Sequence, residues 1–119
     1  ELLARIRVAL RRQKPSVFAT EFVFDSLRID FDKRKVFIDA KEIHLTPIEY
    51  KLLLLLTENS GKVLTHSFIQ KQVWGYDSGD DYQTLRVFMA NIRKKIELDT
   101  LRPRFILTEI GVGYRFADE

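Results

Sequence analysis

The segment from residue 82 to residue 98 constrains the fold more than any other, because its apolar residues recur with the period of an α-helix. Four of them follow one another at spacings of four, three and four residues: Leu85, Met89, Ile92 and Ile96. These spacings place all four side chains on one side of a helix. We therefore predict a helix over residues 82 to 98, capped by Asp80 or Asp81, with this row turned toward a hydrophobic core.

The opposite face of this predicted helix carries side-chain types that read double-stranded DNA. Its outward-facing residues are Gln83, Arg86, Val87, Ala90, Asn91 and Lys94, with Arg93 on the flank. Cationic chains reach phosphates or guanine edges, an Asn amide pairs with adenine, and a Val contacts a thymine methyl. The small Ala90 lets the helix approach a groove closely. An ordinary solvated helix face is the alternative interpretation of this feature taken alone.

Positive charge is concentrated in two segments of a chain whose net charge is only +3. Residues 82 to 104 contain six Lys or Arg against two acidic residues, and residues 1 to 15 contain five against one. The other segments are net acidic. Such segregation is typical of proteins with a polyanionic partner, although cationic helices are also often merely solvated.

A strong helix start precedes a leucine-rich run. Thr46 is a good N-cap, Pro47 suits the first helical position, and Glu49 completes a capping box. The run from Leu52 to Leu56 is apolar on nearly all sides, so we expect a buried central helix that ends near residues 59 to 61.

Thr65 is predicted to cap a second helix that ends at Gly75. Its apolar side would consist of Phe68, Ile69, Val73 and Trp74. Together with the next loop and the helix over residues 82 to 98, it would form an extended helix-turn-helix.

Period-two patterns on both sides of the helices predict strands. Residues 22 to 44 indicate three or four short antiparallel strands. Residues 105 to 109 and 114 to 116 indicate a closing hairpin around Gly111-Val112-Gly113, a turn that needs positive φ. The predicted fold class is therefore α+β: a winged helix-turn-helix with an N-terminal antiparallel sheet, three helices and a C-terminal β-hairpin wing.

The first residues indicate the end of another domain. Residues 1 to 12 have the pattern of an amphipathic helix with four arginines, and residues 14 to 20 are predicted to be a linker. Because the chain begins without Met inside this helix, we expect a fragment of a longer protein. A basic membrane-surface element is the alternative for this helix. The longest apolar run is too short to cross a bilayer, and we expect a cytoplasmic protein.

Enzyme and metal chemistry find little support in these residues. The chain has no Cys, and its two histidines, His44 and His66, lack partners at a recognised ligand spacing. No nucleophile, base and orienting group can be assembled, so we expect neither catalysis nor a metal or cofactor. A winged-helix module that binds only proteins is the main alternative to a DNA-binding domain.

Four motifs resemble a known family. They are LTPIEYKLL at residues 45 to 53, GKVLTHSFIQKQVWG at 61 to 75, the run from Arg86 to Ile96 that ends in Arg-Lys-Lys-Ile, and TEIGVGYRF at 108 to 116. Over roughly residues 22 to 117, the chain resembles the C-terminal DNA-binding domain of OmpR/PhoB-type response regulators. A narrower likeness, to regulators of potassium-transport genes within that family, is carried by HLTPIEY, VWG, LRVFMANIRKKIE and RPRFILTEIGVGYRF.

The resemblance implies a phosphorelay-controlled transcription factor of a two-component system. Residues 1 to 13 would end the last receiver-domain helix, and residues 21 to 119 would form the DNA-binding domain. In the helix that enters the major groove, the matching positions are Thr84, Arg86, Val87, Ala90, Asn91, Arg93 and Lys94. We add Tyr82 and Gln83, at the start of this helix, to the predicted DNA-binding residues. Positions that commonly meet the DNA backbone in the family match Trp74, Thr108, Gly113 and Tyr114.

The resemblance also implies partners, and the chain departs from the family pattern in two places. Ala90 and Asn91 replace Arg residues found in some members, so the base preferences of those members cannot be transferred. Ile110 stands where some members place an Arg that enters the minor groove, so we expect the hairpin to hold phosphates instead. Family members bind direct repeats head to tail, which implies a homodimer on DNA. The loop from Asn59 to Leu64 would contact RNA polymerase, and a cognate sensor histidine kinase would act through the receiver domain.

Overall fold

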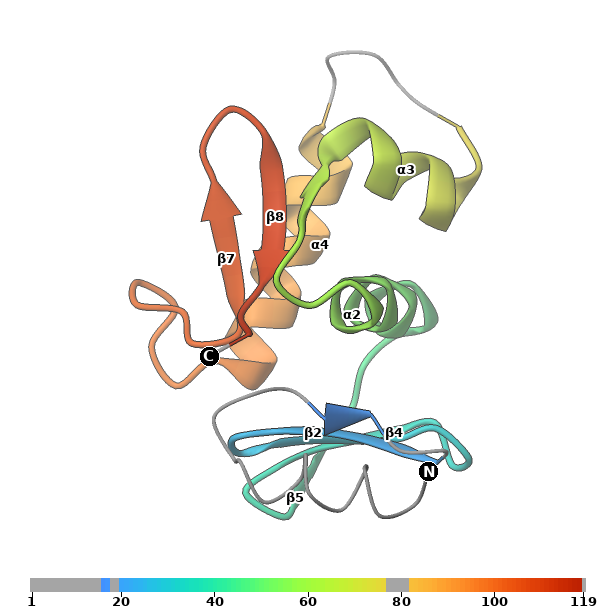
Figure 1. Ribbon diagram of the computed structural model, residues 1–119, viewed down its shortest axis with the longest axis vertical. Helices are drawn as coiled ribbons and strands as arrows, with labels where there is room; N and C mark the ends of the chain where they lie inside the picture. The colour runs from blue at the N-terminus through green and yellow to red at the C-terminus, as the bar shows by residue number, and fades with distance from the viewer. Residues whose placement is uncertain (1–15, 18–19, 77–81, 119) are drawn as a thin grey trace. The chain divides into compact units, whose positions relative to one another are not determined.

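The computed structural model describes residues 16–17, 20–76 and 82–118 (Figure 1). The predicted helix over residues 1 to 12 and the predicted capping residues Asp80 and Asp81 lie outside the described residues. Within these residues the chain forms two compact units, one reaching to His44 and including Asp118, the other comprising Leu45–Ala117.

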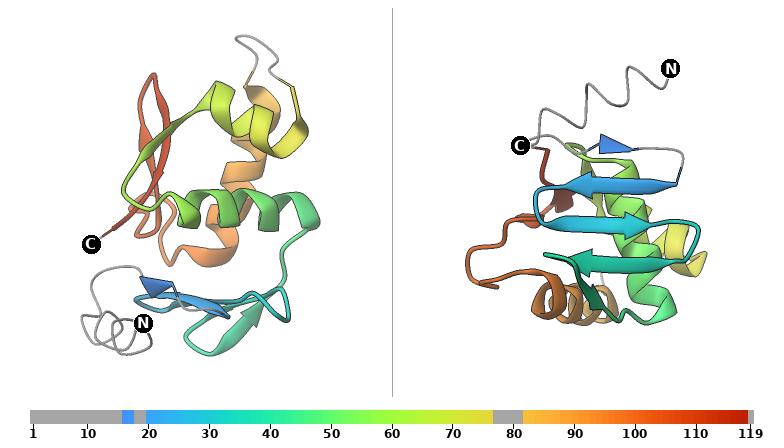
Figure 2. Two further views of the ribbon diagram at one scale, coloured as in Figure 1. Left: turned by 45° about the vertical axis from the view of Figure 1, so that its right-hand side comes forward. Right: turned by 90° about the horizontal axis from the view of Figure 1, so that it is seen from below.

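The first unit is a five-stranded antiparallel sheet with its strands in chain order (Figure 2). Its strands are β1 (Ser16–Val17), β2 (Glu21–Phe24), β3 (Leu27–Asp30), β4 (Lys35–Ile38) and β5 (Lys41–Ile43). Alternate side chains of β2 and β3 are buried, with Phe22 opposite Ile29 in the register. The period-two pattern is therefore confirmed as antiparallel strands. β1 lies in the segment that was predicted to be a linker. The sequence did not predict this strand, because two residues are too few to show an alternating pattern.

In the second unit, α2 (Pro47–Glu58) begins as predicted. The Thr46 hydroxyl accepts a hydrogen bond from the Glu49 amide at 3.3 Å, and the Glu49 carboxylate accepts one from the Thr46 amide at 3.0 Å. These reciprocal bonds satisfy amides that the first helical turn leaves without partners. The capping box is thus confirmed.

The leucines of α2 are not all buried. Leu52, Leu53 and Leu56 are fully buried, whereas Leu54 and Leu55 are half-buried. The expectation of burial along the whole run was therefore wrong at two positions. A helix side that packs against neighbours covers only part of the circumference, and five consecutive residues pass all the way around it.

The second helix, α3 (His66–Trp74), has both predicted caps. The Thr65 hydroxyl accepts from the Phe68 amide at 3.1 Å, and Gly75 ends the helix with φ of 85°. The predicted apolar side is wrong at Phe68, which is 40% exposed, while the neighbouring Gln70 is buried. Strand β6 (Val63–Thr65) leads directly into this helix.

The third helix, α4 (Gln83–Ile96), buries its predicted row: Leu85, Met89, Ile92 and Ile96. Its C-terminal boundary differs from the prediction, since Glu97 is the C-cap and has extended backbone angles. Its N-terminal boundary also differs: the N-cap is Tyr82, without a side-chain capping bond, so the predicted cap at Asp80 or Asp81 was wrong and the helix starts at Gln83. The helix therefore ends two residues before Leu98.

A three-stranded sheet completes the unit, with β8 (Gly113–Phe116) between β6 and β7 (Ile106–Glu109). The β7–β8 hairpin stands beside α4 as a wing (Figure 1). Gly111 has the positive φ that the turn requires, at 77°. Gly113 is glycine for another reason, because an added Cβ would lie 1.8 Å from the Leu64 carbonyl oxygen. The three described helices and the wing make this a winged helix-turn-helix fold.

Candidate nucleic-acid interface

The face of α4 opposite its buried row is exposed, as the periodicity predicts. Its exposed residues are Gln83, Thr84, Arg86, Val87, Ala90 and Lys94, and Asn91 is half-buried. Val87 keeps 48% of its surface exposed in the middle of this face. The face thus combines two cations, two amides and a small apolar centre, a composition that suits base edges in a major groove.

The other two cations of α4 are engaged by the protein itself. Lys95 points to α2, where its Nζ lies 2.6 Å from Oε1 of Glu49. The Glu49 side chain is almost fully buried, so this pair fixes α4 against the start of α2. Arg93 points to the wing. Arg86 and Lys94 are therefore the cations that the helix presents on its exposed face.

Arg93 joins α4 to the wing. Its Nη2 donates to the Ile106 carbonyl at 2.9 Å and to the Thr108 hydroxyl at 2.6 Å, and its Nε donates to Ile106 at 3.2 Å. The guanidinium carbon also lies 5.5 Å from the centre of the Tyr114 ring, a cation–π distance. Three of the residues predicted to bind DNA are therefore in mutual contact.

An aromatic cluster lies where α3, α4 and the wing meet. The His66 ring stacks on Tyr82 with centroids 4.4 Å apart and meets the edge of Tyr114 at 5.6 Å. Burial lowers the pKa of His66, and the positive charge of Arg86 lowers it further. Burial raises the pKa of Tyr114, against the opposing effect of Arg93 and Arg86. A neutral imidazole and a neutral phenol therefore hold this corner together at neutral pH.

The wing exposes its tip and buries its base. Ile110 is 93% exposed and Val112 is 47% exposed, whereas Tyr114 and Gly113 are buried. Near the tip, the Arg115 guanidinium pairs with the Glu109 carboxylate at 3.1 Å. Three wing residues were predicted to contact the DNA backbone: Thr108, Gly113 and Tyr114. Of these, Thr108 is the one that is exposed.

Trp74 closes the second helix. Its half-buried ring lies 5.6 Å from that of Phe88 on α4, which ties the two helices of the helix-turn-helix together. The left-handed Gly75 follows immediately and turns the chain away. Part of the Trp74 ring is therefore committed to packing, and the remainder is at the surface.

Glu97 is a residue that the sequence interpretation missed. The residue is 8% exposed, and its carboxylate accepts hydrogen bonds from the backbone amides of Arg104, Phe105 and Ile106 at 2.6 to 3.2 Å. An acidic residue at a helix C-terminus opposes the helix dipole. In the sequence, this unfavourable position of Glu97 was the one sign that its carboxylate accepts hydrogen bonds from another segment of the chain.

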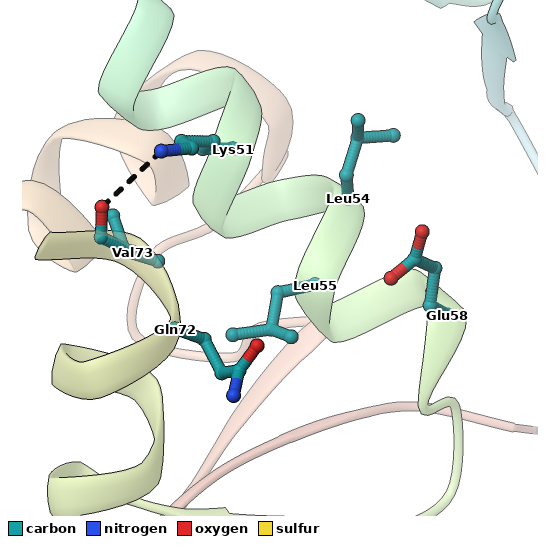
Figure 3. A pocket seen from close by; sticks show the side chains of 6 residues that line it. All are labelled: Lys51, Leu54, Leu55, Glu58, Gln72 and Val73. Carbon is teal, nitrogen blue, oxygen red and sulfur yellow. Dashed lines mark hydrogen bonds between the residues drawn. The ribbon is translucent and has the colours of Figure 1, made fainter. Parts of the chain in front are cut away.

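A small pocket lies on another side of the unit, between α2 and α3 (Figure 3). Its lining residues are Lys51, Leu54, Leu55, Glu58, Gln72 and Val73. The Lys51 ammonium donates to the Val73 carbonyl at 3.3 Å across its edge. At about 210 Å³ it is smaller than typical small-molecule sites. Its position explains why Leu54 and Leu55 are only half-buried.

Two further properties hold for the part of the chain that the structure describes. No cluster of three or more His, Asp or Glu side chains there is arranged to hold a metal ion. Among the same residues, no helix has the length and apolar character needed to cross a membrane.

Comparison with known proteins identifies the family. Residues 40–116 match the family described as "Transcriptional regulatory protein, C terminal". The KDP operon transcriptional regulatory protein KdpE of Escherichia coli is 44% identical over 117 residues, which are 98% of this chain and 52% of that protein. The chain thus spans about half the length of this curated relative.

Solved structures agree with the fold. Response regulator DrrB of Thermotoga maritima, an OmpR/PhoB homologue, has a TM-score of 0.76 and 38% identity, covering 98% of this chain and 51% of DrrB. The RstA DNA-binding domain of Klebsiella pneumoniae, solved in complex with the RstA box, has a TM-score of 0.77 and 25% identity, covering 82% of this chain and 96% of that domain. This chain belongs to the OmpR/PhoB-type response regulators, as a C-terminal DNA-binding effector domain of that family.

Proposed function

We propose that α4 reads the base sequence of double-stranded DNA from the major groove. The observation that carries this proposal is the exposed face of α4, which is set opposite a fully buried apolar row. A helix fits the major groove of B-form DNA, and only there do all four base pairs present distinct patterns. The proposed contact residues are Tyr82 at the N-cap and, on α4, Gln83, Thr84, Arg86, Val87, Ala90, Asn91, Arg93 and Lys94.

The side chains of this face have different proposed roles. The Asn91 amide both donates and accepts, which suits adenine, and Arg86 can bond guanine through two donors. Lys94 is a point charge near the end of the helix, where it would meet a phosphate. Exposed Val87 would cover a thymine methyl.

The wing and the end of α3 are proposed to hold the DNA backbone. Thr108 offers an exposed hydroxyl, and Trp74, Gly113 and Tyr114 occupy the matching family positions. The exposed tip residue Ile110 lacks charge, so we assign the wing no base reading in the minor groove. Backbone contacts of this kind fix the register of a protein on its site without carrying sequence information.

For the whole protein, we propose a two-component response regulator that controls potassium-transport genes. Support comes from its 44% identity to a KDP operon regulator and from the narrower motif likeness. Residues 1 to 13 would end a receiver domain phosphorylated by a sensor histidine kinase, and residues 14 to 20 would link it to the DNA-binding domain. Two copies would bind direct repeats head to tail.

The loop from Asn59 to Leu64 is the proposed contact with RNA polymerase. The Asn59 side chain donates to the Leu55 carbonyl at 2.8 Å, and the Gly61 amide donates to the Phe116 carbonyl at 2.9 Å. These bonds hold the loop in one conformation, and Lys62 at its centre is exposed. A preformed loop loses little entropy when a partner binds it.

Selection of bound sites from random duplexes, followed by titration at several salt concentrations, tests the proposal. We expect one enriched motif, repeated in direct orientation, and an affinity whose logarithm falls with log salt by about 0.9 per neutralised phosphate. A flat salt response and no enriched motif would instead indicate the alternative, a winged-helix module that binds proteins alone.

A further inference from the structure

The start of strand β7 is held to α4 by two side chains that face the wing. Glu97 accepts hydrogen bonds from three consecutive backbone amides, those of Arg104, Phe105 and Ile106. Arg93, one helical turn earlier, donates to the Ile106 carbonyl and the Thr108 hydroxyl. We call Arg93, Glu97 and these partners in residues 104 to 108 the α4–β7 clamp.

The clamp is a two-point attachment. Glu97 is the C-cap of α4 and its amide donates to the Arg93 carbonyl, so the two residues are one helical turn apart, and their bonds to Ile106 show that both side chains face β7. One supplies donors and the other supplies acceptors, and together they bond both the amide and the carbonyl of Ile106. Because Arg93 also lies 5.5 Å from the Tyr114 ring, the attachment reaches β8 as well. A hairpin held in this way cannot rotate about α4 without breaking several charge-assisted bonds.

Glu97 does not occupy a position from which it would touch DNA favourably. It is almost completely buried, and its charge has the same sign as the phosphates. Its placement at the negative end of the α4 dipole is also unfavourable. The three hydrogen bonds that Glu97 accepts from backbone amides offset these unfavourable electrostatic effects, and they point to a structural role for its carboxylate.

We propose that Glu97 is a positioning residue for DNA binding, acting with Arg93 to preset the angle between the wing and α4. This inference rests on the proposed function. A duplex holds its groove floor and its phosphates at fixed separations. A wing already set at the matching angle therefore binds without the entropic cost of ordering it.

Glu97→Gln tests the proposal because simple electrostatics predicts the opposite result. Removing a negative charge should strengthen binding to a polyanion. Loss of the clamp should instead weaken affinity for the selected site by about tenfold and reduce the salt slope by about 1 to 2, since the wing no longer holds its phosphates. Glu58→Gln on α2 makes the same charge change outside the clamp, and should leave affinity equal to or slightly above that of the unchanged chain.

Arg93→Lys provides a second variant that keeps the charge. A lysine there can still meet a phosphate, but it cannot make the forked bonds to Ile106 and Thr108. We expect a similar loss of affinity and salt slope. This variant decides the question if Glu97→Gln fails to fold, and unchanged binding by a folded Arg93→Lys would then overturn the proposal.

Residual dipolar couplings of backbone amides give a readout that is independent of DNA. In the unchanged chain, the α4 and β7–β8 amides should fit one alignment frame. In Glu97→Gln they should require two frames or show reduced couplings in the wing. A folded Glu97→Gln that binds as tightly as the unchanged chain, with one frame, overturns this inference alone. Failure of the unchanged chain to bind any duplex overturns the proposed function, and this inference with it.

Discussion

The Lys95 ammonium on α4 lies 2.6 Å from Oε1 of Glu49 on α2, and the same Glu49 oxygen accepts a hydrogen bond from the Thr46 amide. One carboxylate therefore caps α2 and anchors α4 to it. Burial raises the pKa of Glu49, but the bonds from Lys95 and Thr46 together outweigh it, and the pKa is lowered below its ordinary 4.5.

This shift predicts how stability depends on acid. A lowered pKa in the folded state means that the ionised Glu49 stabilises the fold above pH 4.5, and that this contribution is lost as the pH falls through the folded-state value. Glu49→Gln should therefore destabilise the chain by about 1 to 3 kcal/mol at neutral pH and by less in acid. Urea titrations of both proteins from about pH 7 to pH 3 measure the difference. A difference that stays constant over this range would contradict the assigned role.

The leucines of α2 predict a graded response to truncation. Leu53→Ala should cost about 2 to 5 kcal/mol, because Leu53 is fully buried and its removal leaves a cavity. Leu55→Ala should cost clearly less, because Leu55 is half-buried and already lines the pocket on α2 and α3. Urea denaturation compares the two variants directly, and equal losses would argue against this packing.

Two glycines of the wing should respond differently to alanine. Gly113→Ala should destabilise by about 2 kcal/mol or more, since its Cβ would meet the Leu64 backbone and push β6 away from β8. Gly111→Ala has open space around its Cβ and should cost about 1 kcal/mol, from its positive φ alone. Thermal unfolding ranks the pair, and the reverse ranking would rule out the close approach.

Asn91 should determine base preference. Asn91→Ala is expected to relax the preference at one position of the selected site, at a cost of about 1 to 3 kcal/mol for the preferred base. Titration of a set of duplexes that differ at single positions measures it. The same loss for every duplex would show that Asn91 does not read a base.

Lys94 should act without sequence preference. Lys94→Ala is expected to weaken binding to all duplexes by a similar factor and to lower the salt slope by about 1. Lys94→Arg keeps the charge and should retain the slope. An unchanged slope in Lys94→Ala would exclude a phosphate contact at this position.

Local patterns predicted the parts of this fold that depend on near neighbours in the sequence. The capping residues Thr46 and Thr65 and the left-handed Gly75 act within one helical turn, so each is visible as a short motif. The buried row of α4 follows from helical periodicity in the same way.

Features that depend on distant segments were missed. β6 has three residues and exists through its pairing with β8, about 50 positions further along, so no local pattern predicted it. The same holds for Gly113, which is explained by the Leu64 backbone rather than by a positive φ.

The candidate site was predicted in composition but not in its internal contacts. Periodicity separated the exposed from the buried residues of α4, yet it could not show that Arg93 bonds to Thr108. Both were predicted as DNA-binding residues, and their mutual bond depends on how β7 lies along the helix. Glu97 was missed because its donors are seven to nine residues away, across a loop.

Thr65 is both the last residue of β6 and the N-cap of α3. No loop separates the sheet of the wing from the first helix of the helix-turn-helix, so nothing there can absorb a displacement. If the wing holds a duplex as proposed, a displacement of the wing would therefore be transmitted directly to α3.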